Sequence, residues 1–180
     1  DHEVSEQKEP EYEVIPSENN GKVAIVGAGP AGITCAYHLA RNGHEVTIYE
    51  SLDEPGGMSA VGIPDYRLPR NILQREVQQI QKMGVSINYG QTIGKDLTLS
   101  QLETDFDAVF IGIGAQGSIH MGIEGEDQEY QGFIQGLAYL QEVNAGRDPY
   151  PQGKKVMVIG GGNVAVDVAR TALRSGARDA

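Results

Sequence analysis

The glycine-rich turn at residues 27–32, Gly-Ala-Gly-Pro-Ala-Gly, constrains the fold of this chain more than any other segment. It follows the short apolar run 23–26, Val-Ala-Ile-Val, which is typical of a parallel strand buried on both faces. A helical pattern over 33–39 ends at Asn42-Gly43, and a second apolar run occupies 46–49. The order strand, glycine turn, helix, strand predicts a βαβ unit, a parallel sheet and an α/β fold of the Rossmann-like type.

The spacing of these glycines is the fingerprint of a dinucleotide-binding turn. Gly27 allows a sharp turn, Gly29 lets a pyrophosphate approach the backbone, and Gly32 lets helix and strand pack closely. Glu50 ends the next predicted strand 23 residues after Gly27, where a carboxylate accepts hydrogen bonds from ribose hydroxyls and repels a 2′-phosphate. This predicts FAD or NAD, not NADP; the alternative is a fortuitous glycine turn beside a solvated Glu50. The predicted contacts are Gly27, Ala28, Gly29, Pro30, Ala31, Gly32 and Glu50.

A second glycine turn, Gly-Gly-Gly-Asn-Val-Ala at 160–165, repeats the pattern near the end of the sequence. It follows the predicted strand 156–159 and opens a helix predicted over 163–175. The 23-residue spacing of the first site would place the residue that separates NAD from NADP beyond Ala180, so we expect a longer polypeptide and an incomplete second site. The alternative is a purely structural turn. The predicted nicotinamide-nucleotide contacts are Gly160, Gly162, Asn163, Val164 and Ala165.

The rest of the chain divides by composition and periodicity. Residues 54–69 hold three prolines and three glycines, which predicts irregular structure. Further elements are predicted as a helix with Leu73, Val77 and Ile80 on one face, strands at 85–89 and 108–113, the second of them buried, and a helix at 134–143. The predicted domains are an acidic extended lead-in at 1–21, the first part of an FAD-binding domain at 22–150, and the truncated start of an NAD(P)-binding domain at 151–180.

Charge and cysteine content exclude several classes of function. The chain has 25 acidic and 14 basic residues, a net charge of −11, which argues against nucleic-acid binding. Cys35 is the single cysteine, so the chain can form no internal disulfide, no cysteine-ligated cluster and no redox cysteine pair. The histidines are isolated, and no catalytic acid–base pair or metal site is predicted. No apolar run is long enough to cross a membrane, and a cytoplasmic location is expected.

Together with both glycine turns, the segments Gly56-Gly57-Met58 and Gly-Ile-Pro-Asp-Tyr-Arg-Leu-Pro at 62–69 give the chain a family resemblance. It resembles the small (beta) subunit of NADPH-dependent glutamate synthase, the flavin half of dihydropyrimidine dehydrogenase, and the large subunit of NADH-dependent ferredoxin:NADP oxidoreductase. The resemblance implies an FAD domain with an inserted nicotinamide domain. It also implies hydride transfer between NAD(P)H and FAD, followed by electron transfer to iron–sulfur clusters on missing sequence or on a partner. The resemblance further implies cofactor contacts at Gly57, Met58, Arg67, Gly114 and Ala115, and Ile93 is also predicted as a contact.

Two alternatives remain at this level. Flavin monooxygenases and amine oxidases share the first glycine turn but lack a second nucleotide unit, so the turn at 160–165 argues against them. A non-enzymatic subunit that holds FAD as an electron relay is compatible with both turns. For Arg67, the alternative to a flavin contact is an ion pair with a surface carboxylate. The 180 residues alone are expected to bind FAD poorly and to be inactive.

Overall fold

A computed structural model describes residues 14–15, 20–118, 120–126, 128, 130, 132–147 and 152–180. The described residues form two compact units. The sheet unit lies within Asp1–Gly57 and Asn71–Gly114, and the helical unit lies within Met58–Arg70 and Ala115–Ala180. Most of the predicted lead-in at 1–21 falls outside the described residues, and the predicted domain boundaries stay predictions.

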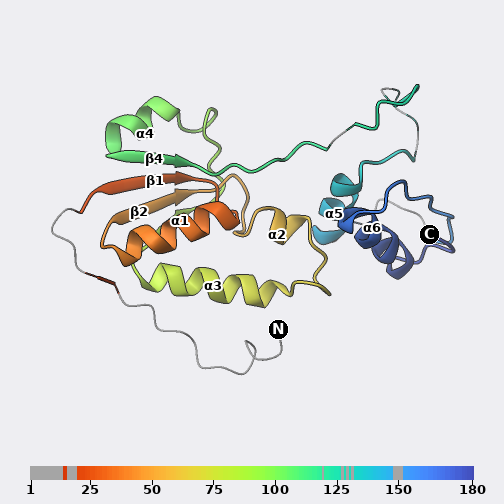
Figure 1. The fold of residues 1–180 in the computed structure, drawn as a ribbon, viewed down its shortest axis with the longest axis horizontal. Coiled ribbons are helices and arrows are strands. Elements are labelled where there is room, and N and C mark those ends of the chain that lie inside the picture. The colour runs from red at the N-terminus through yellow and green to blue at the C-terminus, as the bar shows by residue number, and fades with distance from the viewer. Residues whose placement is uncertain are drawn as a thin grey trace. The chain divides into compact units, whose positions relative to one another are not determined.

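The sheet unit contains four parallel strands in the order β3-β2-β1-β4. Figure 1 shows β1 between β4 and β2. They are β1 (Lys22–Val26), β2 (Glu45–Tyr49), β3 (Ser86–Asn88) and β4 (Ala108–Ile111). This confirms the strands predicted at 23–26, 46–49 and 85–89. Because β2 lies on one side of β1 and β4 on the other, the strand order reverses at β1, and the residues after Val26 lie at a topological switch point of the sheet.

Helices cover both faces of this sheet. Val23 and Ile25 of β1 pack with α1 (Pro30–Arg41) and α3 (Arg70–Lys82), whereas Ala24 and Val26 pack with Leu102 of α4 (Leu99–Asp105). This alternation follows from the two-residue period of a strand. The helix predicted through Val77 and Ile80 is confirmed as α3, in which both are buried.

Helix α4 was not predicted, although its sequence carries a start signal. The Thr98 side chain accepts a hydrogen bond from the backbone N–H of Gln101, and the Gln101 side chain reaches back to the Thr98 backbone. This capping box satisfies two amides that the first turn of a helix leaves unpaired. The Thr-x-x-Gln pattern could therefore have placed the start of α4.

Two sequence predictions in the sheet unit and its neighbouring segment are wrong. Strand β4 was predicted to be buried, but it is the edge strand of the described sheet, and Phe110 and Ile111 are 37% and 55% exposed. Only its Val109 joins the cluster around Leu102. The segment predicted to be irregular contains the one-turn helix α2 (Met58–Val61), because the four residues between Gly57 and Gly62 include neither glycine nor proline.

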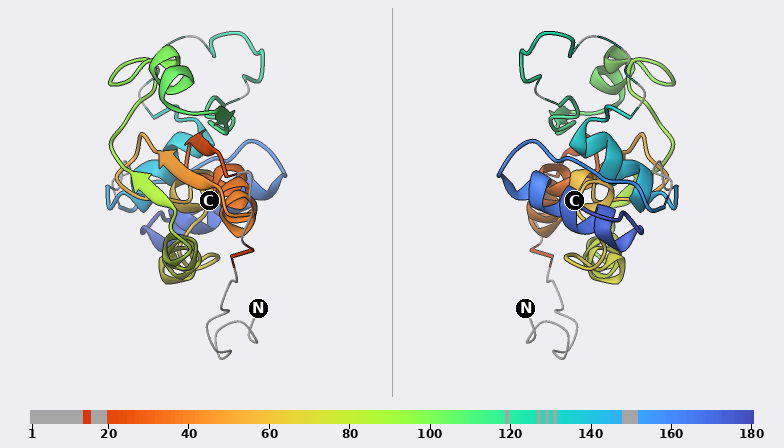
Figure 2. Two further views of the ribbon diagram at one scale, coloured as in Figure 1. Left: turned by 90° about the vertical axis from the view of Figure 1, so that its left-hand side faces the viewer. Right: turned by 90° about the vertical axis from the view of Figure 1, so that its right-hand side faces the viewer.

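The helical unit is built on α5 (Gly136–Asn144) and α6 (Asn163–Arg174), which confirms the helices predicted at 134–143 and 163–175. They pack through Tyr139 and Leu140 of α5 and Val168 and Ala172 of α6. Figure 2 shows the two helices, in cyan and blue. The strand predicted at 156–159 is wrong. Met157 is 83% exposed. Among the described residues, the single β-pairing near this segment is an isolated parallel bridge between Lys155 and Asp179. A strand without paired neighbours is not stable. No helix in the described part of the chain is long and apolar enough to span a bilayer.

Candidate functional site

The first glycine turn joins β1 to α1 and shows which glycines the fold itself requires. Gly27 has φ +101°, and a Cβ there would lie 2.6 Å from the carbonyl oxygen of Gly112. A Cβ on Gly32 would lie 1.9 Å from the carbonyl oxygen of Gly27. Real Cβ atoms do not approach backbone oxygen this closely, so both positions must be glycine for β1 and α1 to pack.

Gly29 differs, because neither its backbone conformation nor its packing requires a glycine. Its φ is −74°, which any residue adopts, and the nearest atom to a Cβ there would be the Cα of Gly57, at 4.0 Å. It is the N-cap of α1, which starts with Pro30 and has no side-chain cap. An uncapped helix N-terminus with an open glycine position fits a diphosphate that approaches the backbone amides.

Glu50 lies directly against this turn. The residue follows β2, is 5% exposed, and accepts a hydrogen bond from the Ala28 backbone N–H at its Oε2 (2.6 Å). Its Oε1 accepts from the Leu52 N–H (2.8 Å) and the Ser51 hydroxyl (3.1 Å). Burial, and secondly the charge of Glu50, raise the pKa of the Tyr89 phenol. The carboxylate therefore connects the end of β2 to the glycine turn in addition to its predicted role at a ribose.

The Gly56-Gly57 turn lies beside Gly29. The Gly56 N–H donates to the carbonyl oxygen of Ala28 (2.8 Å), and Gly57 has φ +51°. A Cβ on Gly57 would lie 3.0 Å from the Cα of Gly29. The structure thus brings together the turn at 27–32, Glu50 and Gly57, all within the sheet unit.

The remaining predicted contacts are spread more widely. Ile93 packs with the cluster of Ala24, Val26 and Leu102 on the α4 face of the sheet. Gly114 follows β4 with φ +69°, Ala115 is exposed, and Met58 begins α2 in the helical unit. Sequence reasoning did not single out Gly112, which approaches Gly27. Its signal was the Gly-Ile-Gly run after β4.

The second glycine turn is open at the start of α6. Gly160 has φ +132°, and Gly162 is the N-cap of α6 with φ −80° and no side-chain cap. A Cβ on Gly161 or on Gly162 would meet no atom within 4 Å. Residues 160–164 are exposed, so the amides at the start of α6 are accessible to an anion.

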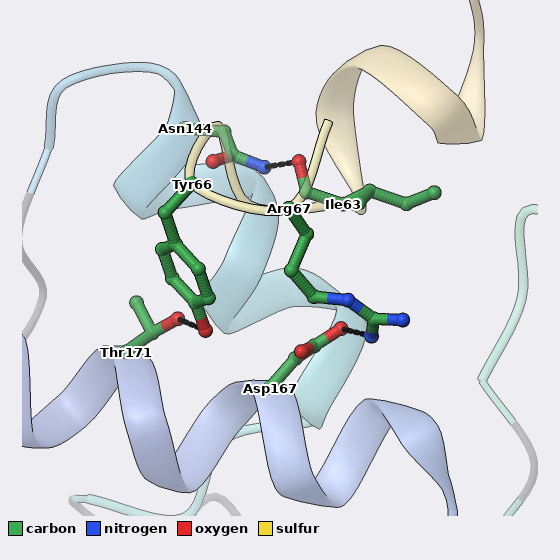
Figure 3. A network of polar contacts seen from close by, with 6 residues as sticks. All are labelled: Ile63, Tyr66, Arg67, Asn144, Asp167 and Thr171. Carbon is green, nitrogen blue, oxygen red and sulfur yellow. Dashed lines mark hydrogen bonds and ion pairs between the residues drawn. The ribbon is translucent and has the colours of Figure 1, made fainter. Parts of the chain in front are cut away.

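Arg67 is held by α6. Its Nη1 donates to Asp167 Oδ2 at 2.6 Å (Figure 3), and the Asp167 side chain is 7% exposed. This resembles the ion-pair alternative considered for Arg67, except that the carboxylate is buried. A contact between Arg67 and a flavin stays a prediction.

Further polar contacts fix the chain segment that carries Arg67. The Asn144 Nδ2 of α5 donates to the carbonyl oxygens of Val61 (2.8 Å) and Ile63 (3.2 Å). The Tyr66 hydroxyl lies 3.4 Å from the Thr171 hydroxyl of α6 (Figure 3). The Tyr66 ring packs beneath two guanidinium groups of α6, with centroid distances of 5.1 Å for Arg170 and 4.0 Å for Arg174. We call residues 61–67 the docking segment.

Nucleophilic and metal-ligating groups are sparse. Cys35 is partly buried, and burial raises the pKa of its thiol, which lowers its reactivity. Within the described ranges, no three His, Cys, Asp or Glu side chains lie close enough together to hold a metal ion. The chemistry suggested by the geometry is therefore nucleotide binding at two helix N-termini.

Comparison with known proteins supports this interpretation. The family model described as "Pyridine nucleotide-disulphide oxidoreductase" matches residues 21–179. The chain is 55% identical over 158 residues to the NADP(+)-dependent formate dehydrogenase subunit beta of Moorella thermoacetica, covering 88% of this chain and 22% of that protein. It is 52% identical over 182 residues to the NADPH-Fe(3+) oxidoreductase subunit beta of Geobacter sulfurreducens, covering 99% and 27%.

Two further similarities are more distant. The chain is 37% identical to the glutamate synthase [NADPH] small chain of Escherichia coli over 87% of its own length and 35% of the relative. Among solved structures, FprA of Mycobacterium tuberculosis in complex with NADPH matches with a TM-score of 0.70 and 27% identity, covering 84% of this chain and 36% of that one. The chain thus spans about a quarter of the two subunits beta and about a third of the other two proteins.

Proposed function

The chain belongs to the pyridine nucleotide-disulphide oxidoreductase family, and we propose that it is the part of an FAD-dependent oxidoreductase in which hydride passes between NAD(P)H and FAD. The observation that carries the proposal is the pair of uncapped helix N-termini, at α1 and at α6, each preceded by a glycine whose Cβ position is open. Such ends bind diphosphates through free amides and the helix dipole.

The two turns are assigned different nucleotides by charge. The buried carboxylate of Glu50 contacts the Ala28 amide of the first turn, so a 2′-phosphate there would face a like charge in a poorly solvated place. Two of the relatives carry NADPH in their names, and one carries NADP(+). We therefore assign the flavin dinucleotide to the turn at 27–32 and NADP(H) to the turn at 160–165.

The two helix N-termini and Glu50 then have separate roles in binding the two nucleotides. When bound, a flavin supplies the redox chemistry, because it accepts a hydride from reduced nicotinamide and passes electrons on one at a time. The amides at the start of α1 bind the diphosphate of FAD, while Glu50 binds its ribose and orients the turn. The amides at the start of α6 bind the diphosphate of the nicotinamide nucleotide. No side chain of this segment is required to act as a nucleophile or an acid–base catalyst.

We propose that the electron acceptors of the flavin lie outside these 180 residues. We propose iron–sulfur clusters on other sequence or on a partner as acceptors, in a cytoplasmic assembly, because the single cysteine of this chain cannot ligate a cluster. Three of the relatives are named as subunits or as a small chain, which supports an assembly. We also propose that residues 22–150 begin the FAD-binding domain, that 151–180 begin the nicotinamide domain, and that these 180 residues alone are inactive.

The test uses the full-length protein in an anaerobic cuvette, where NADPH and NADH are each titrated against the absorbance of the bound flavin. We expect NADPH to bleach the flavin. Gly29→Ala should fold but be purified with less flavin than wild type. Gly162→Ala should keep its flavin but need about tenfold more NADPH. Gly161→Ala is the matched control, because a Cβ there also meets no atom within 4 Å and the predicted contact pattern does not use Gly161.

The outcomes separate the proposal from its alternatives. Bleaching by neither nucleotide would favour the non-enzymatic relay subunit and contradict hydride transfer. Normal bleaching in Gly162→Ala would contradict the assignment of the second turn. Normal flavin content in Gly29→Ala would contradict the assignment of the first.

A further inference from the structure

Asp167 occupies an unexpected position for a negative charge. It lies on α6 four residues after Asn163, about 6 Å along the helix axis from the end that we assign to an anionic diphosphate. It is the single acidic residue of α6 and is 5% exposed. A buried carboxylate there repels a nucleotide diphosphate unless another group neutralises it.

Arg67 is the group that does so. Its Nη1 contacts Asp167 Oδ2 at 2.6 Å, whereas the buried Oδ1 has no hydrogen-bond partner among the residues that the structure describes. Among the residues that the structure describes, the one cation paired with Asp167 is Arg67, which lies 100 residues earlier in the chain.

The docking segment is fixed so that Arg67 reaches this place. The Asn144 side chain donates to the carbonyl oxygens of Val61 and Ile63, and the Tyr66 hydroxyl lies beside that of Thr171 (Figure 3 draws Ile63, Tyr66, Asn144 and Thr171). The Tyr66 ring also lies against Arg170 and Arg174 of α6. Arg170 and Arg174 are thereby stacked on Tyr66. These contacts order Arg67 before any nucleotide arrives, which lowers the entropic cost of holding the ion pair.

We propose that Arg67 is a positioning residue for the nicotinamide nucleotide: it neutralises Asp167 and so makes the start of α6 accept a diphosphate. The inference rests on the proposed function, in which NADP(H) binds at 160–165. It assigns the docking segment to the nicotinamide site through Asp167, a role separate from any contact that Arg67 makes with the flavin.

The test is a charge cycle in the full-length, flavin-loaded protein, read as the Kd of NADP⁺ by calorimetry at low ionic strength. The variants are Arg67→Gln, Asp167→Asn and the double variant. Glu142→Gln serves as control, because it removes an exposed ion pair of the same unit, with Arg147 (2.7 Å), in which neither partner belongs to α6. Thermal unfolding without nucleotide verifies that each variant folds.

The two single variants should change the affinity in opposite directions. Arg67→Gln leaves the carboxylate uncompensated and should weaken NADP⁺ binding about tenfold, with a smaller loss at high ionic strength. Asp167→Asn leaves an unopposed cation and should tighten binding, while the double variant should return to within about threefold of wild type. Glu142→Gln should bind as wild type does.

Other outcomes overturn the inference. Equal weakening in both single variants, with no recovery in the double variant, would show that the ion pair only supports the fold. An effect of Arg67→Gln on flavin content alone would show that Arg67 serves only the flavin. If wild type binds neither NADP⁺ nor NADPH, the proposed function fails, and this inference fails with it.

Discussion

Replacing Glu50 tests how a ligand-binding residue can also hold the fold. The change is Glu50→Ala in the full-length protein without its flavin. It removes the acceptor of three hydrogen bonds, from Ala28, Ser51 and Leu52. The two backbone donors differ in whether water can replace the lost carboxylate. Ala28 is fully buried, so its N–H loses its partner without gaining water, whereas Leu52 is 38% exposed and its N–H can be hydrated.

The expected loss of stability follows from this difference. A hydrogen bond to a charged group contributes about 1.5–3 kcal/mol, and a buried donor left without a partner costs about 1–3 kcal/mol. Because Leu52 and Ser51 recover part of their bonding from water, we expect Glu50→Ala to lower the free energy of unfolding by about 2–4 kcal/mol. Glu50→Gln keeps one acceptor oxygen and should lose about half as much.

The assay is equilibrium urea unfolding of the apoprotein, with Glu45→Gln as the matched control. Glu45 begins β2, the strand that Glu50 follows, but its ion pair with Lys22 is exposed and 3.5 Å long, so its loss should cost less than about 1 kcal/mol. A Glu50→Ala midpoint equal to that of Glu45→Gln would refute the structural role of the carboxylate. Saturating FAD should stabilise Glu50→Ala less than wild type if Glu50 also binds the ribose.

Two further predictions concern the backbone of α1 and the loop before α5. Gly32→Ala should destabilise the apoprotein by at least about 3 kcal/mol in urea, because its Cβ would lie 1.9 Å from the Gly27 oxygen, while Gly29→Ala should leave the midpoint nearly unchanged. Equal midpoints for these two variants would contradict the packing argument. Glu126 accepts hydrogen bonds from the Met121 and Gly122 amides at 2.8 and 2.6 Å; the first of these bonds is the largest cause that lowers its pKa. The ionised Glu126 carboxylate therefore contributes fully to the stability of the fold above the ordinary glutamate pKa of about 4.3. This contribution is lost as the pH falls through the lowered pKa of Glu126. NMR titration of both amides should show a midpoint below the ordinary one, and Glu126→Gln should abolish it.

Local patterns predicted the elements whose residues are close together in the chain. The β1–α1–β2 unit followed from an apolar run, a glycine spacing and a helix stop, all within about 30 residues. The helices α3, α5 and α6 followed in the same way from periodicity. The capping box at Thr98 belongs to this class and was overlooked.

Burial and pairing were harder to predict, because they depend on which segments become neighbours. An apolar run at 108–111 and another at 156–159 look alike in sequence. The first pairs with β1 as an edge strand, and the second has a single bridge to Asp179 among the described residues. Hydrophobic composition therefore predicted a tendency to form strands but not the partner that a strand requires.

The amino-acid sequence by itself determined the parallel α/β unit, the two glycine turns and the acidic residue that accompanies the first turn, because these depend on residue type and short spacing. Only the tertiary structure decided that Gly112 closes on Gly27, that Glu50 binds the Ala28 amide, and that Arg67 neutralises a buried Asp167. Those contacts join residues that are 22 to 100 positions apart in the chain. Periodicity and capping rules act over a few residues, whereas such contacts form only when whole elements pack against one another.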